Sequence, residues 1–208
     1  MFDNNLKNYL ESNILVQYKN FDRAHNISHI KSVIENSIEL MKSHDVNYDM
    51  VYTIAMFHDL GLPQGRDTHH LTSAILLEND YFIKEYFNNE QITIMKQAIE
   101  DHRASNPNKP RSIYGKIISS ADRTIDVDTV IYRTLVYGID HNKSITLVDN
   151  IKRTYEHVIN KYGYDGYLKL PLITNTNKTN LEQLRKLTED YKQFSDKCID
   201  IYKSIITN

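Results

Sequence analysis

The stretch YTIAMFHDLGLP, residues 52–63, places two polar side chains at the end of an apolar helix. Apolar residues three, four and seven positions before His58 put this histidine on the face that the helix buries. Asp59 lies about 100° further around the helix, and Gly61 and Pro63 are typical of a helix end. Because a helix C-terminus disfavours a carboxylate, we expect a positive charge close to Asp59. The alternative is a hydrogen-bonded histidine and a solvated acid at an ordinary helix end.

The composition favours a helical protein without an extreme charge. Glycine (6) and proline (4) are scarce among the 208 residues, and no sustained polar–apolar alternation predicts a sheet. The formal net charge of −2 provides no strong nucleic-acid signal. The N-terminus lacks a signal-peptide pattern, no apolar run is long enough for a membrane span, and the one cysteine cannot form an internal disulfide. We therefore expect an all-α cytoplasmic protein.

Helical spacing of apolar residues predicts helices joined by short segments that contain recognisable breakers. They are expected near 3–19, 28–44, 48–60, 68–87, 90–103, 112–138, 145–162 and 178–206. The longest interruption between them is 163–180. We expect a bundle of about 7–9 helices. Its core should span 1–140, with a C-terminal segment at 141–208 packed on that core in the same domain.

A second acid occupies an apolar helical face in YGKIISSADRTID, residues 114–126. Apolar residues at helical spacing on both sides put Asp122 on the buried side. An ionised aspartate there is costly unless it is paired or binds a metal. Arg123 points about 100° away, so it is not an automatic partner. An ion pair with a distant basic residue is the competing explanation.

Further histidines stand where helices are expected to begin or end. His25 and His29 lie four residues apart in RAHNISHIKSV, and His29 opens the buried face of the helix that follows. A helix capped by Asn26 or Ser28, with His25 incidental, is as good an interpretation of His25 as a function. The others that stand at helix ends beside loops are His69, His70 and His102.

Four of these side chains form a set of nitrogen and oxygen donors on three helices: His29, His58, Asp59 and Asp122. Mixed imidazole and carboxylate donors suit Mn, Fe, Co, Ni or Zn, with Mg as a further candidate. The set contains no thiolate, which disfavours a structural zinc site. His102 and either His69 or His70 would widen the site.

The order H…HD…D resembles the HD-domain superfamily of metal-dependent phosphohydrolases. AHNISHIKSV resembles the first-histidine helix of that family, AMFHDLG its namesake motif, and KIISSADRTID its closing aspartate motif. HHLTSAILL and EDHRAS resemble the segments that often carry extra histidines. The resemblance covers roughly residues 20–130, and it is strongest to small stand-alone bacterial hydrolases. It implies a helical fold and hydrolysis of a phosphoric ester.

The resemblance also implies a role for each matching residue. The ligands of one metal would be His29, His58, Asp59 and Asp122. Asp59, next to His58 in the catalytic centre, would also steer the attacking water or accept its proton. In branches with two metals, extra histidines hold the second ion or contact phosphate. His102 matches one such position, and His69 matches another better than His70 does, so the number of ions, one or two, stays open.

Two branches of the superfamily fit poorly. Its ppGpp hydrolases carry an acidic ED pair soon after HD, and HDLGLPQGRD has none. Its cyclic-di-GMP branch needs an extended HDIGK…GYP pattern, which residues 61–67 do not show. Neither substrate is therefore expected.

A phosphorylated substrate requires positive charge beside the metal. The cations in the segments expected to line the cleft are Arg66, Arg103, Lys116 and Arg123. We expect a phosphomonoesterase or phosphodiesterase that acts on a nucleotide or another small phosphorylated metabolite. The alternatives are a non-catalytic helical domain that senses a nucleotide or a metal, and a helical protein without a site. The segment 141–208 could also support a homodimer.

Overall fold

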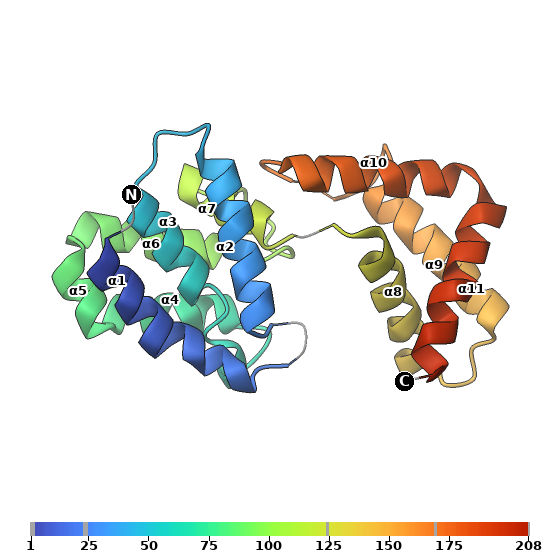
Figure 1. Ribbon diagram of the computed structural model, residues 1–208, viewed down its shortest axis with the longest axis horizontal. Helices are drawn as coiled ribbons and strands as arrows, with labels where there is room; N and C mark the ends of the chain where they lie inside the picture. Colours follow the sequence, from blue (N-terminus) through green and yellow to red (C-terminus); the bar gives the residue numbers. More distant parts are fainter. Residues whose placement is uncertain (1–2, 23–24, 124, 169, 208) are drawn as a thin grey trace. The chain divides into compact units, whose positions relative to one another are not determined.

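All regular secondary structure is helical in the residues that the computed structural model describes, which are 3–22, 25–123, 125–168 and 170–207 (Figure 1). The predicted all-α class is confirmed. Contacts divide the chain into two compact units. The first comprises Met1–Thr124 and Leu170–Thr174, and the second comprises Ile125–Lys169 and Asn175–Asn208. None of the described helices is both long and apolar enough to cross a membrane.

The first unit contains helices α1 to α7. Their bounds are Asn4–Tyr9 (α1), Ile27–Met41 (α2), Tyr48–Phe57 (α3), His69–Asn79 (α4), Tyr81–Tyr86 (α5), Asn89–Asp101 (α6) and Ile113–Ala121 (α7). A π-helix, Leu10–Ile14, and two 3-10 helices, Leu15–Asn20 and Leu62–Gln64, lie between them. In Figure 1, α2 and α3 run beside each other, and the two helices are in contact.

The core of the first unit lies between α2, α3, α6 and α7. Helix α2 packs on α3 and α7, while α6 packs on α3, α4 and α7. Each of the four helices contributes buried apolar side chains, among them Ile30, Ile54, Met95 and Ile118. Burial of such side chains is the main favourable term in folding. It also fixes where the polar residues at the helix ends are placed.

Polar side chains define where these helices begin. The side chain of Asn26 accepts hydrogen bonds from the backbone N–H groups of Ser28 and His29, so Asn26 is the cap of α2. Asn47 caps α3 and Ser112 caps α7 in the same way. Of the two caps predicted for the helix that carries His29, the structure uses Asn26.

The second unit contains helices α8 to α11. Their bounds are Val127–His141 (α8), Leu147–Tyr162 (α9), Asn175–Glu189 (α10) and Tyr191–Thr207 (α11). Helix α8 packs against α9, α10 and α11. The apolar core of this unit includes Ile131, Leu135, Val158, Leu184 and Phe194, all of which are buried. The second unit therefore has a core of its own.

Four predicted helices are interrupted in the structure. The segment 3–19 changes from α to π to 3-10 geometry, and 68–87, 112–138 and 178–206 each form two helices. At each break between two helices an aspartate caps the next helix: Asp80 accepts from the N–H of Ile83, Asp126 from the N–H of Thr129, and Asp190 from the N–H of Lys192. A cap residue has an extended backbone, so it ends the preceding helix even where the apolar pattern continues.

The boundary between the units lies before α8, whereas we predicted a core that extends to residue 140. Helix α8 packs with the other helices of the second unit, so it belongs there. The short segment Leu170–Thr174 belongs to the first unit instead, where the N–H of Leu172 donates to Ser120 Oγ at 3.0 Å. The predicted packing of the C-terminal segment on the core stays a prediction.

Candidate metal centre

The ends of core helices in the first unit bring polar residues together. His29 stands in the first turn of α2, His58 is the C-cap of α3, and Asp59 follows it. Asp122 is the C-cap of α7, with 24% of its side chain exposed. The prediction that Asp122 lies within a continuous helix is therefore wrong. A helix end suits a metal ligand because side chains there are not covered by a further turn.

The first donor cluster consists of His29, His58, Asp59 and Asp122. His29 Nε2 lies 3.2 Å from Asp122 Oδ1 and 3.6 Å from Asp59 Oδ2. His58 Nε2 lies 3.3 Å from Asp59 Oδ2 and 3.7 Å from Asp122 Oδ1. One ligand atom from each residue lies within 4.8 Å of all the others. The structure thus brings together the four side chains that the sequence singled out.

The second donor cluster shares Asp59 with the first and adds His69 and His102. Asp59 Oδ1 lies 3.3 Å from His69 Nε2 and 3.4 Å from His102 Nε2, and all three residues are buried. Its other oxygen, Oδ2, is the one that faces the first cluster. A single carboxylate therefore lies between two sets of histidines.

Three histidines of these clusters are oriented by the backbone in the same way. The Nδ1 atoms of His58, His69 and His102 lie 2.8, 2.6 and 2.6 Å from the carbonyl oxygen three residues earlier in the chain. A carbonyl oxygen only accepts, so Nδ1 carries a proton in each ring. The Nε2 atoms of the neutral rings then present lone pairs to the carboxylates, which is the arrangement typical of metal-bound histidine.

The arrangement of nitrogen atoms fits a bound cation. His29 Nε2 and His58 Nε2 are buried and have no hydrogen-bond partner among the described residues. His69 Nε2 lies only 3.2 Å from His102 Nε2. Two lone pairs at that distance repel each other unless a proton or a metal ion lies between them. Imidazole and carboxylate donors together suit a divalent transition metal, so these clusters could bind one or two such ions.

Without a metal, the carboxylates favour protons on the neighbouring histidine rings. Burial alone would lower the pKa of His58, but Asp59 and Asp122 hold that pKa well above its ordinary value. Burial would raise the pKa of Asp59, yet His58, His102 and His29 hold it well below its usual range. The pKa of Asp122 is lowered by His29 and His58, again against the effect of burial. The clusters therefore favour positive charge beside ionised carboxylates.

Two other predicted histidines flank the clusters without belonging to either. Burial, together with the nearby rings of His102 and His69, lowers the pKa of His70. His70 Nδ1 is buried and has no hydrogen-bond partner among the described residues. The ring of His25 meets the ring of His29 edge-on at 5.8 Å between centroids, and its Nδ1 donates to Asp22 Oδ1 at 2.8 Å.

The four predicted cations occupy different positions. Arg103 donates to the backbone oxygen of Asp67 at 2.5 Å and to Asp67 Oδ1 at 3.1 Å, so it joins the end of α6 to the loop before α4. Arg66 and Lys116 are exposed. Arg123, the residue after Asp122, is half-buried, and burial lowers the pKa of its guanidinium group. Their expected contacts with phosphate stay a prediction.

Gly61 has a role that its sequence context did not reveal. Its φ of −79° is not the left-handed conformation expected of a glycine that ends a helix. A Cβ atom on Gly61 would lie 2.6 Å from the backbone oxygen of His69 and 2.7 Å from the backbone nitrogen of Ser73. The N–H of Gly61 donates to Ser73 Oγ at 2.8 Å. Gly61 therefore allows α4 to approach closely, which brings His69 to Asp59.

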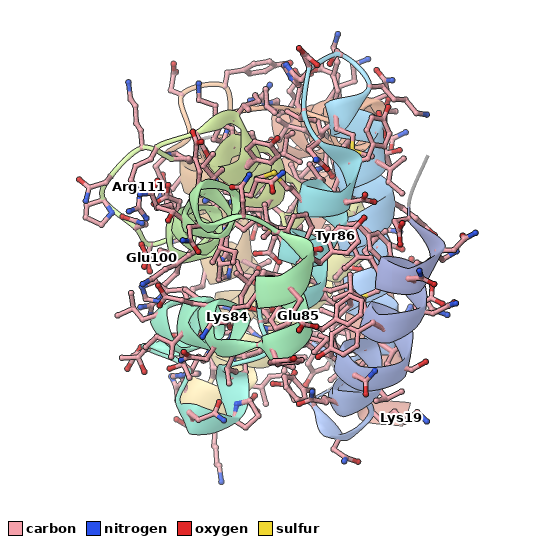
Figure 2. The ribbon with its side chains drawn as sticks, turned by 90° about the vertical axis from the view of Figure 1, so that its left-hand side faces the viewer. Lys19, Lys84, Glu85, Tyr86, Glu100 and Arg111 are labelled. Atoms are coloured by element: carbon pink, nitrogen blue, oxygen red, sulfur yellow. The ribbon has the colours of Figure 1, made fainter. Side chains whose placement is uncertain are left out.

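Two further contacts hold the helix ends in place. Asn36 of α2 donates from Nδ2 to the carbonyl oxygen of Ala121 at 3.0 Å, next to Asp122. Arg111 donates from Nε to Asp101 Oδ1 at 3.0 Å and from Nη2 to Glu100 Oε2 at 2.6 Å, and Figure 2 shows Arg111 and Glu100 close together. These contacts join residues far apart in sequence or across a loop, so no local pattern predicts them.

Comparison with known protein families agrees with this geometry. A family model described as the HD domain matches residues 26–125. All six residues of the two clusters lie inside the matched segment. Residues 26–125 form an HD domain. The HD domain begins at the cap of α2 and ends at Ile125, the first residue of the second unit, so the rest of the second unit lies outside the family match.

Two individual proteins are similar to parts of this chain. An uncharacterized protein of Clostridium beijerinckii is 30% identical over 103 residues, which are 48% of this chain and 63% of that protein. The chain therefore matches less than two thirds of the length of that relative. A crystal structure described as a predicted HD superfamily hydrolase from an uncultured Thermotogales bacterium is 22% identical, with a TM-score of 0.47, over 75% of this chain and 86% of that one.

Proposed function

We propose that this HD domain is a metal-dependent phosphoric ester hydrolase. Its substrate would be a nucleotide or another small phosphorylated metabolite, and it would act as a phosphomonoesterase or a phosphodiesterase. The observation that carries the proposal is Asp59, whose two oxygens face two separate sets of histidine Nε2 atoms. Such a donor set is suited to one or two ions of Mn, Fe, Co, Ni or Zn, with Mg as a further candidate.

A divalent cation held there would lower the pKa of a coordinated water and polarise a phosphoryl oxygen. The chain itself supplies orientation, because backbone carbonyls hold His58, His69 and His102 with Nε2 toward the carboxylates. Asp59 stays ionised because its pKa is held well below the usual range by His58 despite burial. Its carboxylate would therefore accept a hydrogen bond from an attacking water and orient it.

The substrate phosphate would meet the exposed end of the site. Arg66 and Lys116 present exposed charges there in our proposal, and His70 offers a buried Nδ1 atom without a partner among the described residues. Arg103 would act indirectly, because its guanidinium group holds Asp67 and the loop before α4. His25, oriented by Asp22, is a further candidate for contact with substrate beside His29.

The test is hydrolysis by protein that has been stripped of metal and then reloaded. We would assay p-nitrophenyl phosphate, its bis ester and a panel of phosphorylated metabolites with Mn, Mg, Co and Ni in turn. Activity should depend on metal and should be lost in Asp59→Asn. The matched control is Asp45→Asn, which removes a carboxylate from an exposed loop of the same unit. Undiminished hydrolysis by Asp59→Asn would contradict the proposal.

The same experiment distinguishes hydrolysis from sensing. A protein that binds a metal and a nucleotide but hydrolyses nothing in the panel would be the non-catalytic domain instead. Elemental analysis that finds no metal after reloading, with no loss of stability on chelation, would exclude both functions.

A further inference from the structure

The N-terminal segment 3–20 lies outside the family match, yet it packs on α2 and α3. Its buried side chains recur every four residues, which keeps them on one face: Leu6, Leu10, Ile14 and Tyr18. The first three are apolar, whereas Tyr18 takes a hydroxyl group into the core with 0% of the residue exposed. A buried hydroxyl group needs a hydrogen-bond partner. The partner of this one lies in the helix that leads to the metal centre.

The Tyr18 hydroxyl group meets the end of α3. It donates to the carbonyl oxygen of Met56 at 2.9 Å. In a continuing α-helix that carbonyl would accept from the N–H of Leu60, four residues later. The N–H of Leu60 donates instead to the carbonyl oxygen of Phe57, at 3.0 Å. The last carbonyls of a helix need donors from elsewhere, and Tyr18 supplies one for Met56.

The same hydroxyl group is close to Asp59. Burial, and then the charge of Asp59, raise the pKa of Tyr18 well above its ordinary value, while a hydrogen bond from the Asp59 backbone opposes the rise. The phenol therefore keeps its proton and donates it to Met56, while its oxygen accepts from the backbone of Asp59. One hydroxyl group thus contacts the backbone on both sides of His58.

The ring of Tyr18 is held independently of its hydroxyl group. Tyr18 lies in the 3-10 helix Leu15–Asn20, which packs against α2. Its ring centroid lies 4.6 Å from that of Phe21, with an interplanar angle of 50°. Removal of the hydroxyl group alone should therefore leave the ring in place.

A small shift at the end of α3 would reach both donor clusters. Asp59 Oδ2 lies 3.3 Å from His58 Nε2, and Asp59 Oδ1 lies 3.3 Å from His69 Nε2. Without the Tyr18 hydroxyl group, the buried carbonyl of Met56 would lose its donor, which favours rearrangement of the helix end. Groups that orient metal ligands typically change metal affinity by roughly 10- to 100-fold.

We propose that Tyr18 is a positioning residue of the metal centre, whose hydroxyl group fixes the end of α3 and so holds Asp59 between the two donor clusters. The inference rests on the metal binding that the proposed function requires, but not on which ester is hydrolysed. It also gives a role to the N-terminal segment, which the family match does not include.

The test is isothermal titration calorimetry of the metal-stripped full chain with Zn and with Mn. Y18F keeps the ring and removes the hydroxyl group. It should bind metal at least about tenfold more weakly than the wild type. The stoichiometry should not change, because every ligand residue is still present. Where the wild type binds two ions, both should bind more weakly, since Asp59 belongs to both clusters.

The matched control is Y52F. The hydroxyl group of Tyr52 donates to Glu11 Oε1 at 3.1 Å, so it joins α3 to the same N-terminal segment, one turn before Met56. Each variant loses one hydrogen bond between the segment and α3, and each should unfold at a lower urea concentration. Only Y18F should also weaken metal binding, which a purely structural tyrosine would not do.

The outcomes separate this inference from the hydrolase proposal. Circular dichroism establishes that both variants are folded at the temperature of the titration. Wild-type metal affinity in Y18F would overturn the role of Tyr18 and leave the hydrolase proposal standing. Equal weakening of metal binding by Y52F would overturn it as well, because general destabilisation would then account for both variants. A wild-type chain that binds no metal would overturn both proposals together.

Discussion

Histidines of the two units have neighbours of opposite charge. In the first unit His58 lies against Asp59 and Asp122, which raise its pKa against the effect of burial. In the second unit His157 lies near Lys161 and Arg153, and burial together with these charges lowers its pKa. The first surrounding favours a protonated ring or a bound cation, and the second favours a neutral ring. Neighbouring charge, more than the presence of histidine, therefore distinguishes the candidate metal site from the surroundings of His157.

Substitution of single ligand residues should have the largest effect on metal binding and should distinguish the two donor clusters. With two ions in the wild type, His102→Ala should retain one, and Asp59→Ala should retain neither, because both clusters use its carboxylate. Each lost ion should bind at least about 100-fold more weakly. Isothermal titration calorimetry and elemental analysis measure the stoichiometry. His157→Ala is the control from the second unit, and one ion in both the wild type and His102→Ala would indicate a mononuclear site.

Metal removal should destabilise the first unit alone. A ligand that binds only the folded state stabilises it by about 2.7 kcal/mol at about 100 times its Kd. Hydrogen exchange followed by mass spectrometry should therefore show faster exchange in α2, α3 and α7 after chelation. Helices α8 to α11 contain no described metal cluster and should not change. Equally faster hydrogen exchange in both units would show that the metal does not stabilise the first unit alone.

A matched pair of glycine substitutions should sharpen the comparison further. A Cβ at Gly61 would press on the backbone of α4, and one at Gly138 would press on Asn150 of α9. Each change to alanine should lower the free energy of unfolding of its own unit by about 1–3 kcal/mol. Only Gly61→Ala should also weaken metal binding, because it moves His69 relative to Asp59. Urea unfolding and metal titration of both variants provide the measurement.

The motif residues of the metal centre could be predicted from sequence, but the arrangement of their atoms could not. His29, His58, Asp59 and Asp122 meet because the start of α2 and the ends of α3 and α7 lie together in the packed core, which follows once the motifs are assigned to one family. That Asp59 lies between two histidine sets required coordinates. The sequence did contain a local signal for the orientation of two histidine rings. His58 and His102 directly follow helices, where the carbonyl group three residues earlier is available to accept a hydrogen bond.

The helix breaks and the contact between α8 and α9 show the limits of periodicity. An apolar pattern continues across Asp80 and Asp126, so only the side-chain cap at each reveals a new helix. The spacing of Arg153, His157 and Lys161 is visible in the sequence, whereas its alignment with Tyr137 depends on how α8 and α9 pack. Contacts between helices are set by packing of many side chains, which no single segment encodes.

The two units of the metal-free protein should respond to pH in opposite directions. The folded pKa of His58 and those of His29 and His69 are raised, so their stabilising contribution is present below about pH 6.5 and is lost as pH rises through the raised values. The folded pKa of His157 is lowered, so its contribution is present above about pH 6.5 and is lost as pH falls. Urea unfolding followed by NMR at about pH 6 and about pH 8 would resolve both units.

Bound metal should reverse the sign in the first unit only. A cation needs the neutral rings and competes with protons, so its stabilisation should increase as pH rises. Repeating the NMR series with a saturating concentration of a diamagnetic ion, such as Zn, tests this reversal. If the first unit kept the same pH dependence with and without metal, protons and cation would not share these sites.

The smallest expected effect concerns Arg103, which links the loop before α4 to the end of α6. Its partner Asp67 is almost fully exposed, at 96% of its side chain, so the ion pair should contribute less than about 1 kcal/mol. Arg103→Gln should therefore leave the free energy of unfolding nearly unchanged. Because Arg103 also holds the backbone oxygen of Asp67, two residues before His69, a modest rise in KM with little change in kcat is expected. Asp67→Asn is the matched variant, because it removes the charge and keeps the backbone contact. A large loss of kcat in Arg103→Gln with normal KM would show that Arg103 acts on the reacting phosphate directly and not through the loop.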